Sequence, residues 1–279
     1  MTHTGMASKR PVLIMVAPNG ARRTKADHSA LPITPDELAQ TAVECRAAGA
    51  AAIHLHVRDE HERHSLDVGR CVEAVKAVKA ATPEMAIQVT TEAAGICKVD
   101  DQEHLLSEFR PAFASISIAE ILRDGEERGI RILRSAIGAG TRIQYILYSQ
   151  DDIRTLARLR RQIRDDDREP STLLVAGRYG VVDHATVDIV YGLHRVLHAE
   201  GLDAEGRWMT CAFGRGELSC LEAAISLGSH ARVGYENAIV DSKGKLVGNN
   251  AERVSQVADL VQAAGHLPAK PKIASGILG

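Results

Sequence analysis

Eight short apolar segments recur along this chain, with amphipathic stretches between them. Several are apolar at nearly every position, which is typical of parallel strands covered on both faces. Strands that alternate with helices predict a parallel sheet with right-handed crossovers, and eight such units favour closure into a (β/α)8 barrel. The segments lie at residues 11–18, 51–58, 85–91, 113–118, 142–148, 172–177, 207–213 and 231–237.

The connecting stretches have helical character. The first of them carries a start signal at Thr34-Pro35-Asp36-Glu37 and a stop signal at Gly49. Because a barrel commonly occupies about 200 to 250 residues, we expect one barrel domain over 11–265. A disordered segment at 1–10 precedes it, and a tail at 266–279 packs on the barrel or on a partner subunit. Further amphipathic segments lie near 67–80, 123–138, 150–164, 183–199, 216–228 and 249–264, with a weaker one at 101–109.

Composition excludes several classes of protein. The 34 basic and 36 acidic residues are well mixed, so no basic face of the kind that holds nucleic acid is expected. The five cysteines form no C-x-x-C pair, which fits a reducing cytoplasm. The first ten residues lack the apolar core of a signal peptide, and no run approaches the roughly 18 to 20 apolar residues of a membrane span. We therefore expect a cytoplasmic protein that binds neither nucleic acid nor membrane.

Two histidines in the second strand segment suggest a metal site. Residues two apart in a strand point to the same side, so His54 and His56 project together. They lie near the carboxyl end of the strand, where barrel active sites are found, and neutral imidazole is a good ligand for zinc and its neighbours. The pattern alone is weak, because two histidines on one strand are also compatible with hydrogen-bonded core residues.

A carboxylate strengthens the metal hypothesis. Glu236 lies at the same end of the eighth strand segment. Barrel closure places strand eight beside strand one and strand one beside strand two, so Glu236 is expected near both imidazoles. Two histidines and one glutamate leave a tetrahedral zinc ion one open position, which is the arrangement of a catalytic site.

Other histidines are left outside this site. His61 and His64 lie in a polar loop and are predicted to be surface residues. His194 and His198 have the i, i+4 spacing that can hold a metal on a helix, but this spacing more often marks a solvated face.

Four segments of the chain form a recognisable set of motifs. They are VAPNGARRTKADHSALPITPDELA, GAAAIHLHVRD, IQVTT and HARVGYEN. Together they resemble the β-keto acid cleavage enzymes, and the resemblance covers nearly the whole chain. It implies a zinc-dependent β/α barrel that usually forms a homo-oligomer, here a dimer or tetramer. It also implies exchange of acyl groups between a β-keto acid and acetyl-CoA, which gives acetoacetate and a new CoA ester.

The resemblance also implies roles for single residues. His54, His56 and Glu236 correspond to the metal ligands, and Arg232 corresponds to an arginine shortly before the metal glutamate. The hydroxyl and amide groups that bind the substrate carboxylate after the third and fourth strands correspond to Thr90 or Thr91 and to Ser115 and Ser117.

Several positions depart from the family pattern. The family aspartate proposed as the base is Asn237 here, and an amide takes up no proton near neutral pH. An acid that recognises amino substrates aligns with Arg22, which disfavours a cationic substrate. The fifth strand offers Gln144 and Ile146 where amino-acid-handling members carry acids. Glu92 stands where glycine is usual, and a displaced base, a substrate ligand and a surface residue are all compatible with it.

Three functions follow in order of preference. The first is metal-dependent acyl transfer between an anionic or neutral β-keto acid and a CoA thioester, with Arg232, Asn237 and Glu92 as the candidate catalytic positions. The second is aldolase-type or hydrolytic cleavage of a keto acid without CoA, and the third is a metal-holding binding protein that has lost turnover. Gly214 and Arg215 contact CoA phosphates in the first function, although a plain glycine-rich turn explains them equally well.

Overall fold

Eight parallel strands close into a barrel in this computed structural model, which describes residues 9–164, 169–178, 185–204 and 206–278. The eighth strand, β11, pairs with the first, β2, and β2 pairs with β3, as the barrel hypothesis requires. Every predicted apolar segment overlaps one barrel strand, so the predicted (β/α)8 fold is confirmed. Around the barrel the strands are β2 (Ile14–Val16), β3 (Ala52–Leu55), β6 (Ala86–Thr90), β7 (Phe113–Ser117), β8 (Arg142–Leu147), β9 (Ser171–Ala176), β10 (Trp208–Ala212) and β11 (His230–Val233).

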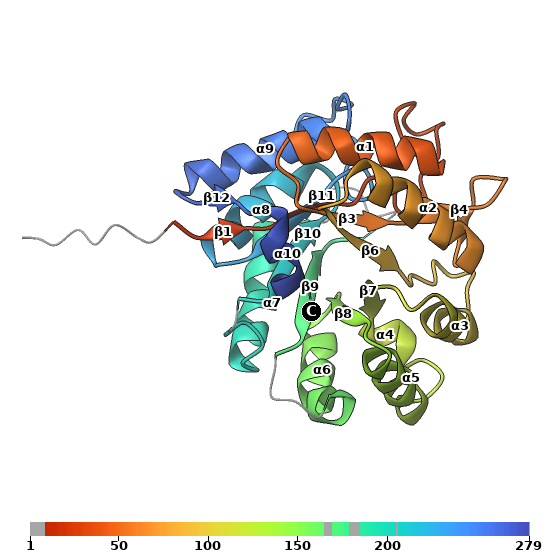
Figure 1. Ribbon diagram of the computed structural model, residues 1–279. Coiled ribbons are helices and arrows are strands. Elements are labelled where there is room, and N and C mark those ends of the chain that lie inside the picture. The colour runs from red at the N-terminus through yellow and green to blue at the C-terminus, as the bar shows by residue number, and fades with distance from the viewer. Residues whose placement is uncertain (1–8, 165–168, 179–184, 205, 279) are drawn as a thin grey trace, which may run out of the picture.

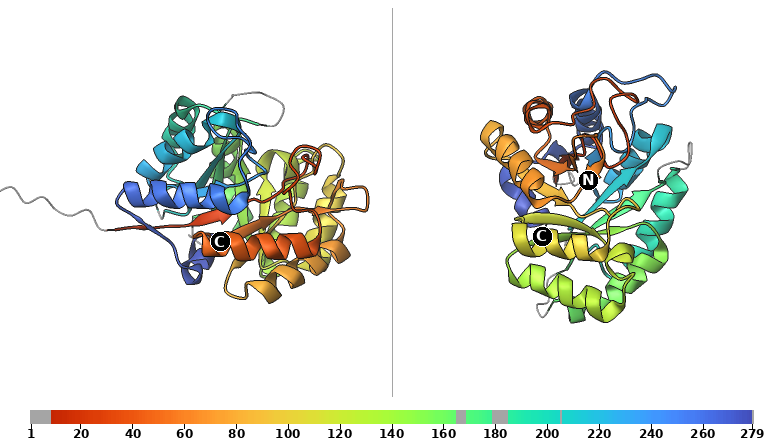
Figure 2. Two further views of the ribbon diagram at one scale, coloured as in Figure 1. Left: turned by 90° about the horizontal axis from the view of Figure 1, so that it is seen from above. Right: turned by 90° about the vertical axis from the view of Figure 1, so that its right-hand side faces the viewer.

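Helices surround the outer face of the strands (Figures 1 and 2). The first of them, α1, begins with a capping box: the Thr34 hydroxyl accepts from the Glu37 amide, and the Glu37 carboxylate accepts from the Thr34 amide. It lies beside α9, which completes the ring of helices (Figure 1). These helices are α1 (Pro35–Ala47), α2 (Val68–Ala81), α3 (Val99–Phe109), α4 (Ile118–Ile121), α5 (Glu126–Gly138), α6 (Gln150–Ile163), α7 (Val187–Ala199), α8 (Glu217–Ser226) and α9 (Asn250–Ala263).

Strand alternation divides the core into an inner and an outer part. Side chains such as Ile53 and Leu55 pack outward against helices, while Met15, Leu173 and Met209 fill the barrel. Aliphatic residues make up most of both parts, as the low aromatic content predicts. The inner face near the carboxyl ends of the strands is polar instead, and that end carries the candidate site.

The C-terminal segment lies under the opposite end of the barrel. A short strand β12 (Leu267–Pro268) pairs in parallel with β1 (Pro11–Val12), and α10 (Pro271–Ile277) follows it. Ala274 and Leu278 are buried with the barrel interior. The predicted disordered segment at 1–10 falls outside the described residues except for its last two positions. Within the described ranges, no helix has the length and apolar character needed to cross a bilayer.

Buried His230 predicts acid sensitivity of the fold. Its Nδ1 accepts a hydrogen bond from the Leu13 amide at 3.0 Å, and burial lowers its pKa to about 3. In the unfolded chain a histidine binds a proton below about pH 6.5, so unfolding takes up a proton between pH 6.5 and 3. Stability is therefore complete above pH 6.5 and falls by up to about 1.4 kcal/mol per pH unit below it.

The measurement is urea unfolding of the wild type and of His230→Gln at pH 7 and pH 5. The glutamine still offers an acceptor to the Leu13 amide but cannot titrate, so its stability is expected to fall less on acidification. His61→Gln is the matched control, since His61 is exposed. Equal pH slopes for wild type and His230→Gln would contradict the assignment.

Candidate metal centre

Three potential ligand atoms converge at the carboxyl end of the barrel. His54 lies in β3, His56 follows it directly, and Glu236 follows β11. The two Nε2 atoms lie 3.0 Å apart. Glu236 Oε2 lies 3.7 Å from His54 Nε2 and 3.5 Å from His56 Nε2. All three residues are buried, and they form one compact group of possible metal ligands.

These separations fit a metal ion. Ligand atoms about 2.0 to 2.1 Å from a tetrahedral zinc ion lie roughly 3.3 to 3.5 Å from one another, and the observed distances bracket that range. Glu236 Oε2 is buried and has no hydrogen-bond partner among the described residues, which is costly unless a cation or proton donor satisfies it. Two imidazoles and a carboxylate are a donor set that suits zinc and neighbouring transition metals.

The charges at the centre favour the metal-binding forms of the ligands. Burial lowers the pKa of His54 well below its usual value, which keeps the imidazole neutral. Burial alone would raise the pKa of Glu236, but Arg232 and the two imidazoles hold it well below its usual range. His54 and Glu236 are therefore ready to bind a cation without first losing a proton.

Arg232 orients the carboxylate of Glu236. Its guanidinium donates to Glu236 Oε1 at 3.1 Å and to Cys211 Sγ at 3.4 Å. Burial lowers the pKa of Arg232, but Cys211 and Glu236 together raise it above the usual value. Because Arg232 occupies Oε1, Oε2 is the oxygen that faces the imidazoles.

The loop that carries Glu236 lies directly against strand β2. Gly234 has φ +141°, and a Cβ there would collide with the carbonyl of Ala17. That carbonyl accepts from the Glu236 amide at 3.1 Å. Arg23 donates to the carbonyls of Tyr235 and Glu236, and Asn250 accepts from the Tyr235 amide. The backbone of this loop is thus held in place by the Ala17 carbonyl and by the side chains of Arg23 and Asn250.

A second carboxylate, that of Glu92, lies beside the centre. Glu92 Oε2 is 3.9 Å from His56 Nδ1, and burial raises the pKa of Glu92 above its usual value. His64 lies next to both residues: its Nε2 donates to the Glu92 carbonyl at 2.7 Å, and its ring lies 5.2 Å from the ring of His56. The prediction that His64 is a surface residue is wrong, because the hairpin of β4 (Val57–Arg58) and β5 (His64–Ser65) folds it against the site.

The predicted substrate-binding hydroxyls all lie at the same end of the barrel, but several have structural partners. Thr90 Oγ1 accepts from the Glu92 amide, and Thr91 Oγ1 donates to the Ser115 carbonyl. Ser117 Oγ caps helix α4 through the Glu120 amide. Within the described part of the chain, the Ser115 hydroxyl is buried without a hydrogen-bond partner. Ser115 is therefore the hydroxyl most in need of a further polar group.

Two of the positions that depart from the family pattern, Arg22 and Asn237, differ in exposure. Arg22 is exposed near the site, where its charge lowers the pKa values of Glu92 and Glu120, although burial raises both overall. Asn237 is fully buried, and its amide group forms no hydrogen bond to any described residue. Arg22 therefore contributes positive charge at the mouth, whereas Asn237 contributes a neutral polar group.

Tyr148 is a further residue of the barrel mouth that local sequence reasoning did not single out. Tyr148 is 45% exposed as a whole, but the crowding around its phenol and the nearby Glu92 carboxylate raise its pKa above the usual value. It follows β8 on the same side as Gln144 and Ile146. The strand alternation that assigns Gln144 and Ile146 to the pocket therefore also indicates Tyr148.

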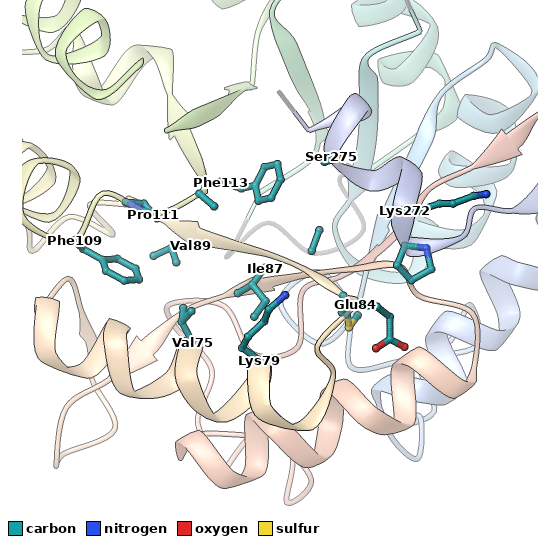
Figure 3. Close-up of a pocket in the computed structure, with 14 residues that line it drawn as sticks. Val75, Lys79, Glu84, Ile87, Val89, Phe109, Pro111, Phe113, Lys272 and Ser275 are labelled. Atoms are coloured by element: carbon teal, nitrogen blue, oxygen red, sulfur yellow. The ribbon is translucent and has the colours of Figure 1, made fainter. Parts of the chain in front are cut away.

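A separate cavity lies at the amino-terminal ends of the strands, away from this centre (Figure 3). It measures about 460 Å³ and lies between α2, the starts of β6 and β7, and α10. Val75, Ile87, Phe109 and Phe113 give it a largely apolar lining. It contains none of the candidate ligands or carboxylates of the metal centre.

Comparison with known proteins yields a family and several relatives. Residues 11–279 match the family model described as beta-keto acid cleavage enzyme. The chain is 28% identical to the 3-keto-5-aminohexanoate cleavage enzyme of Acetoanaerobium sticklandii, over 96% of this chain and 98% of that protein. It is 24% identical to the 3-oxoadipate:acetyl-CoA acetyltransferase of Cupriavidus necator, over 97% and 95%. Among solved structures, apo ObcA has a TM-score of 0.69 at 18% identity, covering 90% of this chain and 65% of that chain, which shows a shared fold.

Proposed function

Because this chain belongs to the beta-keto acid cleavage enzyme family, we propose that it transfers an acyl group between a β-keto acid and acetyl-CoA. The products are acetoacetate and a new CoA ester. The observation that carries the proposal is the convergence of His54, His56 and Glu236, with an unpartnered carboxylate oxygen, at the end of the barrel where catalytic sites form. Two relatives that match over most of the chain, one named as an acetyl-CoA acetyltransferase and one as an acetyl-CoA acetone transferase, support the same reaction.

The proposed metal is zinc, and its bound form would supply a Lewis acid that polarises the keto group. His54, His56 and Glu236 hold it, and Arg232 keeps Glu236 in its ligating orientation. Ser115 and Thr90 are the proposed hydrogen-bond partners of the substrate carboxylate. Tyr148 carries a phenolic O–H group near neutral pH, as an ordinary tyrosine does, and so can donate a hydrogen bond at the mouth.

Glu92 is the proposed base. Asn237 cannot accept a proton near neutral pH, and Glu92 is the carboxylate that lies beside the ligand His56. Burial raises its pKa, which makes its carboxylate a stronger base than an exposed glutamate. It abstracts the proton whose removal starts the reaction.

We propose a β-keto acid with an anionic or neutral polar side chain as the substrate. Arg22 brings positive charge to the mouth and also offsets Glu92 and Glu120, which otherwise repel an anion. The similarity to a protein named for 3-oxoadipate, a dicarboxylic β-keto acid, fits this charge. Cytoplasmic location and a dimer or tetramer remain predictions.

The Arg22→Ala variant is expected to bind an anionic substrate more weakly than the wild type does, and an uncharged one about equally well. Hydrogen bonds to charged groups contribute about 1.5 to 3 kcal/mol, so KM for a dicarboxylic β-keto acid should rise roughly 10-fold to 100-fold. The KM for an uncharged-chain β-keto acid should change little. Steady-state kinetics with both substrates measure the ratio, and Lys25→Ala is the control for an exposed cation of the same loop. A parallel rise for both substrates would remove the charge-selection role.

The decisive experiment incubates the purified, zinc-loaded protein with a panel of β-keto acids, with and without acetyl-CoA. Formation of acetoacetate and a new CoA ester supports acyl transfer. Cleavage that proceeds equally without CoA supports the aldolase-type or hydrolytic alternative, which the amide at Asn237 motivates. Binding of β-keto acids without product, at full metal occupancy, supports a binding protein that has lost turnover.

A further inference from the structure

A row of buried side chains, linked by hydrogen bonds through two glutamine amides, runs from the proposed metal ligand His54 across the inside of the barrel to β9. His54 Nδ1 lies 2.9 Å from Gln88 Oε1, and Gln88 Nε2 donates to Gln144 Oε1 at 3.1 Å. Gln144 Nε2 in turn donates to Ser171 Oγ at 3.3 Å. The four residues come from β3, β6, β8 and β9, and each is almost completely buried. We call His54, Gln88, Gln144 and Ser171 the amide chain.

The orientation of the Gln88 amide and the tautomer of His54 are coupled. A neutral imidazole carries its proton on one nitrogen and a lone pair on the other. In the structure Gln88 presents its carbonyl oxygen, which can only accept, so this orientation pairs with a proton on Nδ1 of His54. The lone pair is then on Nε2, the atom that faces Glu236 and His56. This is the form that a metal ion at Nε2 requires.

The hydrogen bonds from Gln88 to Gln144 and from Gln144 to Ser171 support this orientation of the Gln88 amide. If the Gln88 amide were reversed, its NH2 group would face the Nδ1–H group and its oxygen would face the oxygen of Gln144. The Gln144 carbonyl holds the Gln88 NH2 group, and Ser171 Oγ accepts from the other end of Gln144. Reversal of Gln88 alone is costly, because it leaves donors facing donors. Reversal of the whole chain requires Gln88, Gln144 and the Ser171 hydroxyl to turn together and moves the lone pair of His54 to Nδ1, away from Glu236.

We propose that Gln88, supported by Gln144 and Ser171, is a positioning residue that holds His54 in its metal-binding tautomer. This inference rests on the proposed metal site and adds residues to which no role has been assigned. Gln88 is uncharged, so it orients the ligand without the gain in imidazole basicity that a carboxylate partner gives. A metal ion held by His54 would therefore keep more of its Lewis acidity.

The other imidazole ligand has no comparable support. His56 Nδ1 is buried and unpaired among the described residues, and Glu92 Oε2 lies 3.9 Å from it. The carboxylate beside His56 Nδ1 is thus the one that the proposed function uses for proton transfer. The Nδ1 side of His54 instead faces the amide chain, which contains no titratable group beyond the ligand itself.

The test measures two quantities in the full-length protein. The first is the zinc dissociation constant, determined by competition with a chelator. The second is the tautomer of His54 in the metal-free protein, read from long-range ¹H–¹⁵N spectra of histidine-labelled samples. The wild type is expected to carry the proton on Nδ1. Gln88→Met keeps the volume and removes the acceptor, so the Nε2–H form should gain population and zinc should bind roughly 10-fold to 100-fold more weakly.

Two further variants separate positioning from general damage. Gln88→Glu restores the acceptor, so both the tautomer and the zinc affinity should return toward the wild type. Thr210→Val removes a different buried hydroxyl of the barrel wall, which pairs with Ser229, and should change neither quantity. An unchanged His54 tautomer in Gln88→Met, or an equal loss of zinc affinity in Thr210→Val, overturns the proposal.

The two readouts also distinguish this proposal from the proposed function. If wild-type protein binds no zinc but shows the Nδ1–H tautomer that Gln88→Met abolishes, the metal site fails and the amide chain stands. If zinc binds tightly and the Gln88→Met variant retains both affinity and tautomer, the metal site stands and the amide chain fails.

Discussion

His56→Ala is expected to lose both bound metal and turnover. The substitution removes one of three protein ligands, which leaves His54 and Glu236 as the remaining set. Catalytic zinc sites use three protein ligands, so occupancy should fall below about 0.1 metal ion per chain after dialysis. A Lewis acid contributes several kcal/mol to such a reaction, and kcat/KM should therefore fall by at least about 10³-fold. Elemental analysis and acetoacetate formation measure the two effects.

His61→Ala is the matched control, because His61 is an exposed histidine only five positions along the chain. It should keep the metal content and activity of the wild type. Turnover in His56→Ala without bound metal would show that the reaction needs no metal at this site. A full complement of metal in His56→Ala would show that the ion binds elsewhere.

Much of this centre follows from strand alternation and barrel closure. Alternation puts His54 and His56 on the inner face and Ile53 and Leu55 on the outer face, as observed. Closure brings β11 beside β2 and β2 beside β3, which places Glu236 within reach of both imidazoles. These are rules of regular backbone geometry, so one sequence is enough to apply them.

The partners of the ligands could not be predicted in the same way. The family resemblance indicates Arg232 as a site residue, but not that it donates to Glu236, and nothing in the sequence indicates that Gln88 faces His54. Both contacts depend on side-chain rotamers, which depend on packing that local sequence does not encode. His64 lies in a run of polar letters that indicates an exposed loop, yet hairpin pairing buries it beside His56. Contacts that depend on how a loop folds back on the barrel appear only once the chain is folded.

The position of Glu92 bears on the amide at Asn237. A family base replaced by an amide suggests lost or altered chemistry if nothing else supplies a carboxylate. The structure provides one, at 3.9 Å from His56 Nδ1 and with a side chain only 15% exposed. The same geometry also suits a simpler role, in which Glu92 accepts a hydrogen bond from His56 and only orients the ligand. A base at position 92 must be able to take up a proton, whereas an orienting residue needs only an oxygen that accepts a hydrogen bond.

Glu92→Gln is expected to lower kcat by about 10²-fold to 10⁴-fold with metal content unchanged, since general base catalysis contributes on that order. Glutamine keeps an oxygen that can accept from His56 Nδ1–H but cannot take up a proton. A purely orienting Glu92 therefore tolerates the change, whereas a base does not. Rapid-quench measurement of a single turnover, together with metal analysis, separates chemistry from metal loss.

Glu120→Gln is the matched control for Glu92→Gln. Glu120 is another carboxylate at the barrel mouth whose pKa is raised by burial, and it accepts from the Ala93 amide. A glutamine can still accept that bond, so kcat should fall less than about 10-fold, well below the effect of losing a general base. If Glu92→Gln is equally mild and Asn237→Asp alone increases turnover, the base belongs at position 237, and Glu92 serves His56 instead.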